Sequence, residues 1–214
     1  MKTGDLKNIE NCVMVRTLKK NTILHFTKMT SKYVYLLNEG FIKIVTTNEE
    51  GKEVIKSLVK PGNLFGEMGL LDSTEHTDDY AVAVEDCEIG LIDKEKLKFC
   101  MRTDDELRTE INRQIGSRIR KSENRLLAII FRDAFSRIRD FIVEFALEFG
   151  SANNETYEVK NILTHDDIAK LTATSRQTVS TVLNEMREKK QIEYNSDILR
   201  IPSSSELWKK KSGS

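Results

Sequence analysis

The stretch LTHDDIAKLTATSRQTVSTVLNEMREKKQIEY, residues 163–194, carries the signals for two helices separated by a short turn. Thr164 suits the N-cap of a first helix, HDDIAKLT, and Asp167 follows three residues later as in a partial capping box. Residues 173–174 fit a tight turn, and Ser175 suits the N-cap of a second helix, RQTVSTVLNEMREKK. Two helices joined in this way predict a helix-turn-helix.

The side chains of these two helices divide into a buried set and an exposed set. The apolar residues that can form a small core are Ile168, Ala169, Leu171, Val179, Val182, Leu183 and Met186. In a helix-turn-helix the first residues of the second helix meet the major groove, where arginine donates two hydrogen bonds to guanine and glutamine pairs with adenine. Arg176 and Gln177 occupy those positions. The predicted DNA-contacting residues are Ser175, Arg176, Gln177, Thr178, Ser180, Thr181, Thr164, Lys170, Lys189 and Lys190.

The segment QIEYNSDILRIP, residues 191–202, follows the second helix with the alternation of a hairpin. It predicts a wing beside the recognition helix, and hence a winged helix-turn-helix. Residues 161–214 carry nine Lys and Arg against seven Asp and Glu, a small positive excess. Because phosphate contacts dominate nonspecific DNA affinity, binding is expected to depend on few side chains and on amides at helix N-termini. A winged domain used only for protein contact remains an alternative.

The N-terminal half has the alternating pattern of strands, from about Asn21 to Leu97. In YVYLLNEGFIKIVTTNEEGKEVIKSLV, residues 33–59, β-branched and aromatic runs are broken at 38–40 and 48–53 by turns that contain glycine. A further turn, KPGNLFGEMG, precedes the strand-like AVAVEDCEIGLID. The fold class is therefore predicted as α+β, with an N-terminal antiparallel β-roll.

A long helix is predicted between the two halves, because apolar residues from Asp104 to Ile130 recur at spacings of four and three. About 27 residues span about 40 Å, longer than a small domain needs for its own core, so we expect this helix to form a dimer. The alternative is a helix that only packs on the roll. The predicted dimer interface is Ile111, Ile115, Ile119, Ser122, Leu126 and Ile129.

A hinge is predicted at residues 131–133, because Asp133 is placed to cap a new helix, AFSRIRDFIVEFALEFG. Gly150 at the end of that segment fits a C-cap. The predicted domains are a sensor β-roll at 1–103, a dimerisation helix at 104–131 and a winged helix-turn-helix at 132–214.

Composition excludes several functional classes. Lys and Arg total 34, as do Asp and Glu, so the net charge favours neither nucleic acid nor an anionic membrane. The sequence shows no membrane span and no signal-peptide core, so a cytoplasmic protein without membrane partners is expected. The three cysteines and three histidines are widely spaced, which favours neither a metal site nor a catalytic site, and no cofactor is required. These residues are Cys12, Cys87, Cys100, His25, His76 and His165.

Three segments carry a resemblance to the Crp/Fnr family of bacterial transcription regulators: PGNLFGEMGLLD at 61–72, SRIRDFI at 136–142 and TSRQTVSTVLNEM at 174–186. The resemblance covers nearly the whole chain. It implies an effector-binding β-roll of the cyclic-nucleotide-binding type and a homodimer bound to a near-palindromic stretch of double-stranded DNA. It also implies contact with RNA polymerase. No enzymatic activity is expected, because the sequence has no HxH pair and no Ser-His-Asp or phosphate-loop signature.

The segment that resembles the cyclic-nucleotide cassette departs from the family pattern. Gly66 and Glu67 match, but Thr77 and Asp78 stand where members that bind cyclic AMP carry Arg-Ser, and Asp79 follows. Carboxylates without a guanidinium repel a phosphate, so ordinary cyclic AMP binding is not expected. The effector is unknown, and a regulator that needs none and a true cyclic-nucleotide-dependent regulator both stay open. The candidate effector-binding residues are Gly66, Glu67, Met68, Thr77, Asp78 and Ser122.

Three further points stay open. Glu67 is expected either to cap loop amides or to contact a ligand. His76 is the one candidate for an axial haem ligand, against the alternative of a solvated loop histidine. The recognition helix has Arg176-Gln177 and then Thr181, where many family members have Arg-Glu followed by a second arginine. The operator half-site should therefore differ from the TGTGA-type sequence typical of the family. A β-roll that senses a ligand or partner without reading DNA is the remaining alternative function.

Overall fold

The computed structural model describes residues 13–25, 32–67, 79–152 and 155–211. Contacts between residues divide the chain into two compact units, Met1–Glu123 and Asn124–Ser214. The division falls inside one long helix, α3 (Asp105–Phe131), which contributes to both units.

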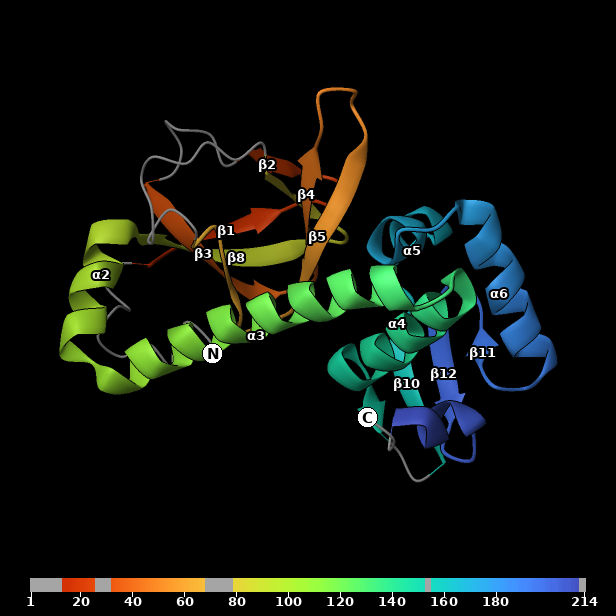
Figure 1. Ribbon diagram of the computed structural model, residues 1–214. Helices are drawn as coiled ribbons and strands as arrows, with labels where there is room; N and C mark the ends of the chain where they lie inside the picture. The colour runs from red at the N-terminus through yellow and green to blue at the C-terminus, as the bar shows by residue number, and fades with distance from the viewer. Residues whose placement is uncertain (1–12, 26–31, 68–78, 153–154, 212–214) are drawn as a thin grey trace. The chain divides into compact units, whose positions relative to one another are not determined.

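The first unit is an antiparallel β-roll, as predicted (Figure 1). Within the described residues it has two four-stranded sheets, with strand orders β1-β8-β3-β6 and β2-β7-β4-β5. The strands are β1 (Val13–Leu18), β2 (Ile23–His25), β3 (Tyr33–Glu39), β4 (Ile42–Thr47), β5 (Glu53–Val59), β6 (Leu64–Phe65), β7 (Tyr80–Ala83) and β8 (Cys87–Asp93). Side chains of both sheets, among them Leu37, Ile42, Phe65 and Ile89, meet in one buried core. The alternation of the sequence thus separates an inner apolar face from an outer face.

Gly40 occupies the turn between β3 and β4 with φ +85°, a left-handed conformation that favours glycine. A Cβ at this position would lie 2.7 Å from both the Asp86 carbonyl oxygen and the Cys87 Sγ. The glycine of the turn at residues 38–40 is therefore required by its backbone conformation and by the close approach of the neighbouring strand.

Two elements of this unit were missed by sequence analysis. The first strand, β1, lies before Asn21, the residue near which the predicted alternation begins. Helix α2 (Lys94–Thr103) lies where strands were expected to continue to about Leu97. The Asp93 carboxylate caps this helix by accepting hydrogen bonds from two backbone amides, at 3.0 and 3.2 Å. Asp93 is both the last residue of β8 and the N-cap of α2, and the strand-like alternation predicts only the first of these roles.

Helix α3 lies where a helix at 104–131 was predicted, but its first turns belong to the roll. Leu107 and Ile111 join a second buried cluster with Val34, Leu64 and Leu97. The prediction that Ile111 lies at a dimer interface is therefore wrong, because its side chain is only 1% exposed within its own chain. Ile115 also packs partly against this cluster.

We expect Ile111→Ala to lower the free energy of unfolding by about 2–5 kcal/mol, since truncating a buried isoleucine leaves a cavity. Urea denaturation of the full chain at several protein concentrations measures this loss. Ile23→Ala is the matched control, because Ile23 on β2 is 51% exposed and its truncation leaves no cavity in the roll. A concentration-dependent loss for Ile111→Ala would return this residue to a subunit interface.

The second unit is a winged helix-turn-helix, also as predicted (Figure 1). Its elements are α4 (Ala134–Phe149), β9 (Ser151–Ala152), β10 (Thr156–Lys160), α5 (His165–Thr172), α6 (Arg176–Glu188), β11 (Glu193–Tyr194), β12 (Ile198–Pro202) and the 3-10 helix η3 (Glu206–Lys211). The four strands form one antiparallel sheet in the order β11-β12-β10-β9. Asp133 caps α4 and Gly150 is its C-cap, as the sequence indicated. Across the described ranges no helix is both long and apolar enough to cross a membrane.

Candidate nucleic-acid interface and effector site

Side-chain caps hold both helix starts of the helix-turn-helix, and the cap of the first helix is reciprocal. Thr164 and Asp167 form a complete capping box: the Thr164 hydroxyl accepts from the Asp167 amide at 3.1 Å, and the Asp167 carboxylate accepts from the Thr164 amide at 3.0 Å. Helix α5 ends at Ala173, whose φ of +51° reverses the chain. The Ser175 hydroxyl then accepts from the Thr178 amide at 3.0 Å and starts α6. The predicted turn and both predicted caps are confirmed.

Arg137, which sequence analysis did not single out, fixes the same turn from α4. Its guanidinium donates to the carbonyl oxygens of Thr172 and Ala173 at 2.8 and 2.9 Å. It also donates at 2.8 Å to the carbonyl oxygen of Arg132, in the segment between α3 and α4. One side chain thus joins the predicted hinge to the turn, because it satisfies carbonyl groups left without partners at helix ends.

Helix α6 has a buried face and an exposed face. Val179, Val182, Leu183 and Met186 are buried against the rest of the domain. Arg176, Gln177 and Thr181 are exposed at the N-terminal end of the helix. The side chains with the strongest predicted base contacts are thus accessible from outside the domain.

Other predicted DNA-contacting side chains have partners within the protein. The Ser180 hydroxyl is 2.7 Å from His165 Nδ1 and 3.1 Å from the Arg176 carbonyl oxygen, so it is engaged inside the domain. Lys170 pairs with Asp166 at 2.9 Å. The Lys189 Nζ lies 3.8 Å from a Glu185 oxygen and 5.9 Å from the Phe135 ring centroid.

The remaining predicted contacts of this group lie at helix ends. Thr164 and Ser175 use their hydroxyls as caps and are exposed, Thr178 is half-buried beside Ser175, and Lys190 follows α6 with φ +55°. Their positions leave contact with a phosphate backbone open, while Ser180 is better described as an internal support of α6.

His165 and Tyr194 were missed as residues of this surface. The His165 ring touches α6 through Ser180 and lies 5.7 Å, centroid to centroid, from the ring of Tyr194 in the wing. Partial burial lowers the pKa of His165, and the positive charge of Arg176 lowers it further. In the sequence the residue was one of three scattered histidines, and no local signal connected it with the recognition helix.

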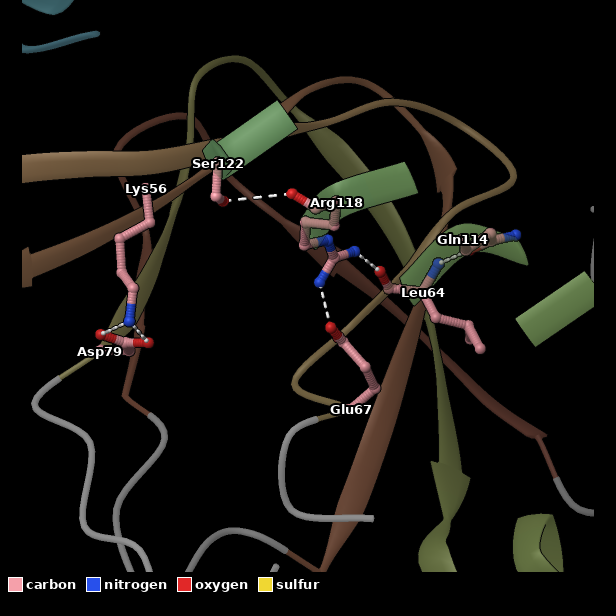
Figure 2. Close-up of polar contacts among 7 residues, drawn as sticks. All are labelled: Lys56, Leu64, Glu67, Asp79, Gln114, Arg118 and Ser122. Atoms are coloured by element: carbon pink, nitrogen blue, oxygen red, sulfur yellow. Dashed lines mark hydrogen bonds and ion pairs between the residues drawn. The ribbon is translucent and has the colours of Figure 1, made fainter. Parts of the chain in front are cut away.

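The candidate effector site of the β-roll is built around Glu67, which follows Gly66 (φ +73°) after β6. The Glu67 side chain is buried, and its Oε1 pairs with an Nη of Arg118 on α3 (Figure 2). Arg118 also donates at 2.6 Å to the Leu64 carbonyl oxygen. Among the residues that the structure describes, Glu67 Oε2 has no hydrogen-bond partner. A structural role of Glu67 is thus present, and one buried acceptor of the same carboxylate is unused.

Gln114, one turn before Arg118, holds the same segment. Its amide oxygen accepts from the Leu64 amide at 3.0 Å (Figure 2). Its amide nitrogen donates to the Gly62 carbonyl oxygen at 3.2 Å. The buried side chain therefore replaces the peptide group of a neighbouring strand for this edge of β6. Gln114 and Arg118 together connect α3 to the segment from Gly62 to Glu67. Neither was predicted, because their partners lie about 50 residues earlier in the chain.

Only some of the other predicted effector residues belong to the part of the chain that the structure describes. Met68, Thr77 and Asp78 lie outside the described residues, as do His76 and Cys12. Ser122 is exposed and donates at 3.1 Å to the Arg118 carbonyl oxygen within its own helix (Figure 2).

Asp79 was one of the two carboxylates expected to repel a phosphate. It pairs with Lys56 Nζ at 2.8 Å (Figure 2). Its charge is therefore largely compensated, and the electrostatic objection to a phosphate rests mainly on Asp78 and on the missing arginine.

We expect Arg118→Ala to lower the free energy of unfolding by about 3 kcal/mol, the lower end for a broken buried pair, because the Arg118 side chain is 28% exposed. The loss comes from leaving the Glu67 carboxylate buried without a counter-ion. Urea denaturation measures it, and adding Glu67→Gln should recover part of it, since a neutral amide needs no counter-ion. Arg113→Ala, which breaks an exposed pair with Glu110 on the same helix, serves as the control and should cost under about 1 kcal/mol.

The described cysteines and acidic residues form no further site. Cys87 is buried and its thiol donates to the carbonyl oxygens of Phe41 and Glu85, and burial raises the pKa of that thiol. Over the part of the chain that the structure covers, no three His, Cys, Asp or Glu side chains are grouped to hold a metal ion.

Comparison with known proteins matches both halves of the chain. The family model of the cyclic nucleotide-binding domain matches residues 15–104, and that of the Crp-like helix-turn-helix domain matches residues 136–209. The global nitrogen regulator of a Nostoc species is 29% identical over 191 residues, covering 88% of this chain and 85% of the relative. A CRP-like cAMP-activated global transcriptional regulator of Mycobacterium tuberculosis is 25% identical over 174 residues, covering 81% and 77%.

Solved structures share the fold over nearly the full length. FixK2 from Bradyrhizobium japonicum has a TM-score of 0.78 at 17% identity, covering 92% of this chain and 96% of that one. A CooA mutant from Carboxydothermus hydrogenoformans has a TM-score of 0.76 at 23% identity, covering 98% and 90%. Because the β-roll, the long helix, the winged helix-turn-helix and both family models agree, the chain belongs to the Crp/Fnr family of DNA-binding transcription regulators.

Proposed function

We propose that this regulator acts as a homodimer on a near-palindromic operator, with one α6 in the major groove of each half-site. The observation that carries the proposal is the exposure of Arg176, Gln177 and Thr181 at the start of a helix whose opposite face is buried. Such a helix presents its first residues to base edges, and two copies related by a two-fold axis match two half-sites about one DNA turn apart. The DNA-reading side chains proposed are Arg176 and Gln177.

Dimerisation is supported by the second half of α3. Ile119, Leu126 and Ile129 are all exposed in the single chain, at 54%, 58% and 43%. They follow one another at spacings of seven and three, which places them on one stripe of the helix. An apolar stripe of this length is covered at little cost when the same helix of a second copy packs against it.

For the effector, we propose a ligand other than ordinary cyclic AMP, or none. The relative from Mycobacterium tuberculosis is described as cAMP-activated, whereas the one from Nostoc is described only as a nitrogen regulator. Two observations support the proposal: Thr77 and Asp78 replace the expected arginine and serine, and the Arg118 guanidinium is already engaged by Glu67 and Leu64. Calorimetric titration of the purified protein with cyclic AMP is therefore expected to show no saturable heat.

We also propose that the dimer contacts RNA polymerase and that the chain has no catalytic activity. Membership in a family of transcription regulators supports both statements, since such proteins act by placing themselves at promoters. Polymerase contact is tested by adding RNA polymerase holoenzyme to the protein bound to its operator. A complex that contains DNA, regulator and polymerase is the expected result.

The experiment that tests the whole proposal is selection of binding sites from random duplex DNA, with purified protein, no added effector, and salt near the physiological level. Enrichment of a palindrome supports a dimer that is already competent to bind. If nothing is enriched, the selection is repeated with a cell extract. A palindrome that appears only then indicates a required effector, whereas continued failure favours a sensing module that does not read DNA.

A further inference from the structure

His165 lies where three elements of the winged domain meet. It is the first residue of α5, its Nδ1 is 2.7 Å from the Ser180 hydroxyl on α6, and its ring packs beside Tyr194 of β11. The ring is half-buried and lies close enough to Arg176 for the two groups to interact electrostatically. A histidine is therefore built into the surface formed by the recognition helix and the wing.

One ring nitrogen remains available. Nδ1 is used by Ser180, and no described residue pairs with Nε2. Because His165 opens a helix, its side chain lies at the positive end of the α5 dipole, beside backbone amides that also favour an anion. Nε2 is thus a donor position at a place suited to a phosphate.

Ser180 accommodates both protonation states of the ring. With neutral His165, the Ser180 hydroxyl can donate to Nδ1. With the imidazolium, Nδ1–H donates to the Ser180 oxygen, and the hydroxyl turns to the Arg176 carbonyl oxygen, 3.1 Å away. Protonation therefore costs no hydrogen bond within the domain.

The surrounding charges favour the neutral ring in the free protein. Burial lowers the pKa of His165 and so does Arg176, the cation that faces it from α6. Tyr194 is the titratable group that faces it from the wing. On α5 itself, Asp166 is paired with Lys170 and Asp167 accepts hydrogen bonds in the capping box. A DNA phosphate beside Arg176 would offset the cation and supply a partner for the imidazolium.

We propose that His165 is a DNA-binding residue that takes up a proton when a backbone phosphate docks at Nε2, so that DNA affinity is coupled to protonation of this ring. The inference rests on the reading of DNA by α6. Since the bound state raises the pKa, affinity is highest below the pKa of the free protein and falls as pH rises through the pKa of the complex. One proton changes affinity at most about tenfold per pH unit.

The test is DNA affinity between about pH 5.5 and about pH 8 at constant ionic strength, measured by fluorescence anisotropy with the full chain. The probes are the duplex recovered by selection and a random-sequence duplex pool, because a phosphate contact should affect both. Wild-type affinity is expected to fall with rising pH, His165→Gln to lose most of that dependence, and His165→Arg to bind tightly with a shallow slope. The matched control is His25→Gln in β2 of the roll, which should keep the wild-type slope.

An NMR titration of the unmodified protein gives a second readout that needs no variant. The pKa of His165 should rise when duplex is added. If this pKa is the same with and without duplex, the proposal is overturned. Retention of the wild-type slope by His165→Gln would overturn it as well. Failure of wild-type protein to bind DNA at any pH, by contrast, counts against the proposed function, so the two failures are distinguishable.

Discussion

Arg176→Ala is expected to reduce affinity for the selected operator by about 30-fold to about 20,000-fold. Each bidentate contact between arginine and guanine is worth about 1–3 kcal/mol, and a dimer makes it twice. The loss should be specific, because the α6 cap is provided by Ser175 and the core of the domain by the opposite face of the helix. Anisotropy titrations with the operator and with a random duplex, at one salt concentration, measure the two affinities.

Gln177→Glu is the companion variant for this prediction. Glutamate only accepts hydrogen bonds and pairs with cytosine N4, whereas glutamine pairs with adenine. Selection with this variant is therefore expected to return a changed base at one position of each half-site, with the rest of the palindrome retained. A uniform loss of affinity for all duplexes would count against base reading by residue 177.

Leu126→Asp is expected to weaken dimerisation at least about 100-fold and to abolish operator binding at concentrations where the wild type is bound. The leucine is 58% exposed in the single chain. Burying it in a dimer contributes about 1.5–3 kcal/mol per copy, and a buried aspartate in each copy removes that and adds a desolvation cost. Sedimentation equilibrium over a range of concentrations gives the dimer dissociation constant, and operator binding follows because a monomer meets only one half-site.

Phe99→Asp is the matched control, since Phe99 is also an exposed apolar residue but lies on α2 rather than on the stripe of α3. It should leave the dimer and the operator affinity unchanged. If Leu126→Asp stays dimeric with wild-type affinity, the second half of α3 is not the dimer contact, and another surface must bring two recognition helices together.

Recognition of the elements from sequence succeeded where the signal is local. The Asp133, Thr164 and Ser175 caps each act on an amide three residues away, so the starts of α4, α5 and α6 could be predicted from nearby residues. The alternation of residues 33–59 likewise predicted an antiparallel roll, because side chains on a strand alternate between two faces. Helix α2 was missed where a strand and a helix share one residue, Asp93.

The residues of the candidate sites also divide into those that local periodicity predicts and those whose role depends on distant parts of the chain. Exposure of Arg176 and Gln177 follows from helical periodicity, which was already visible in the sequence. The roles of Ile111, Gln114 and Arg118 cannot be predicted from periodicity, because a periodic helix does not reveal which neighbouring element covers each of its turns. The sequence predicted one continuous apolar stripe along α3. The structure assigns its beginning to the core of the roll and leaves its later part exposed.

By itself, then, the sequence determined the order of the elements, their caps and the face of α6 that points outward, since these depend on spacings of two to four residues. Only the tertiary structure decided that Arg118 pairs with Glu67, that Arg137 holds the turn, and that His165 supports the recognition helix. The physical reason is that these contacts join residues between 15 and 51 positions apart. Such pairs form only after packing of the core has brought their elements together, and no local pattern specifies them in advance.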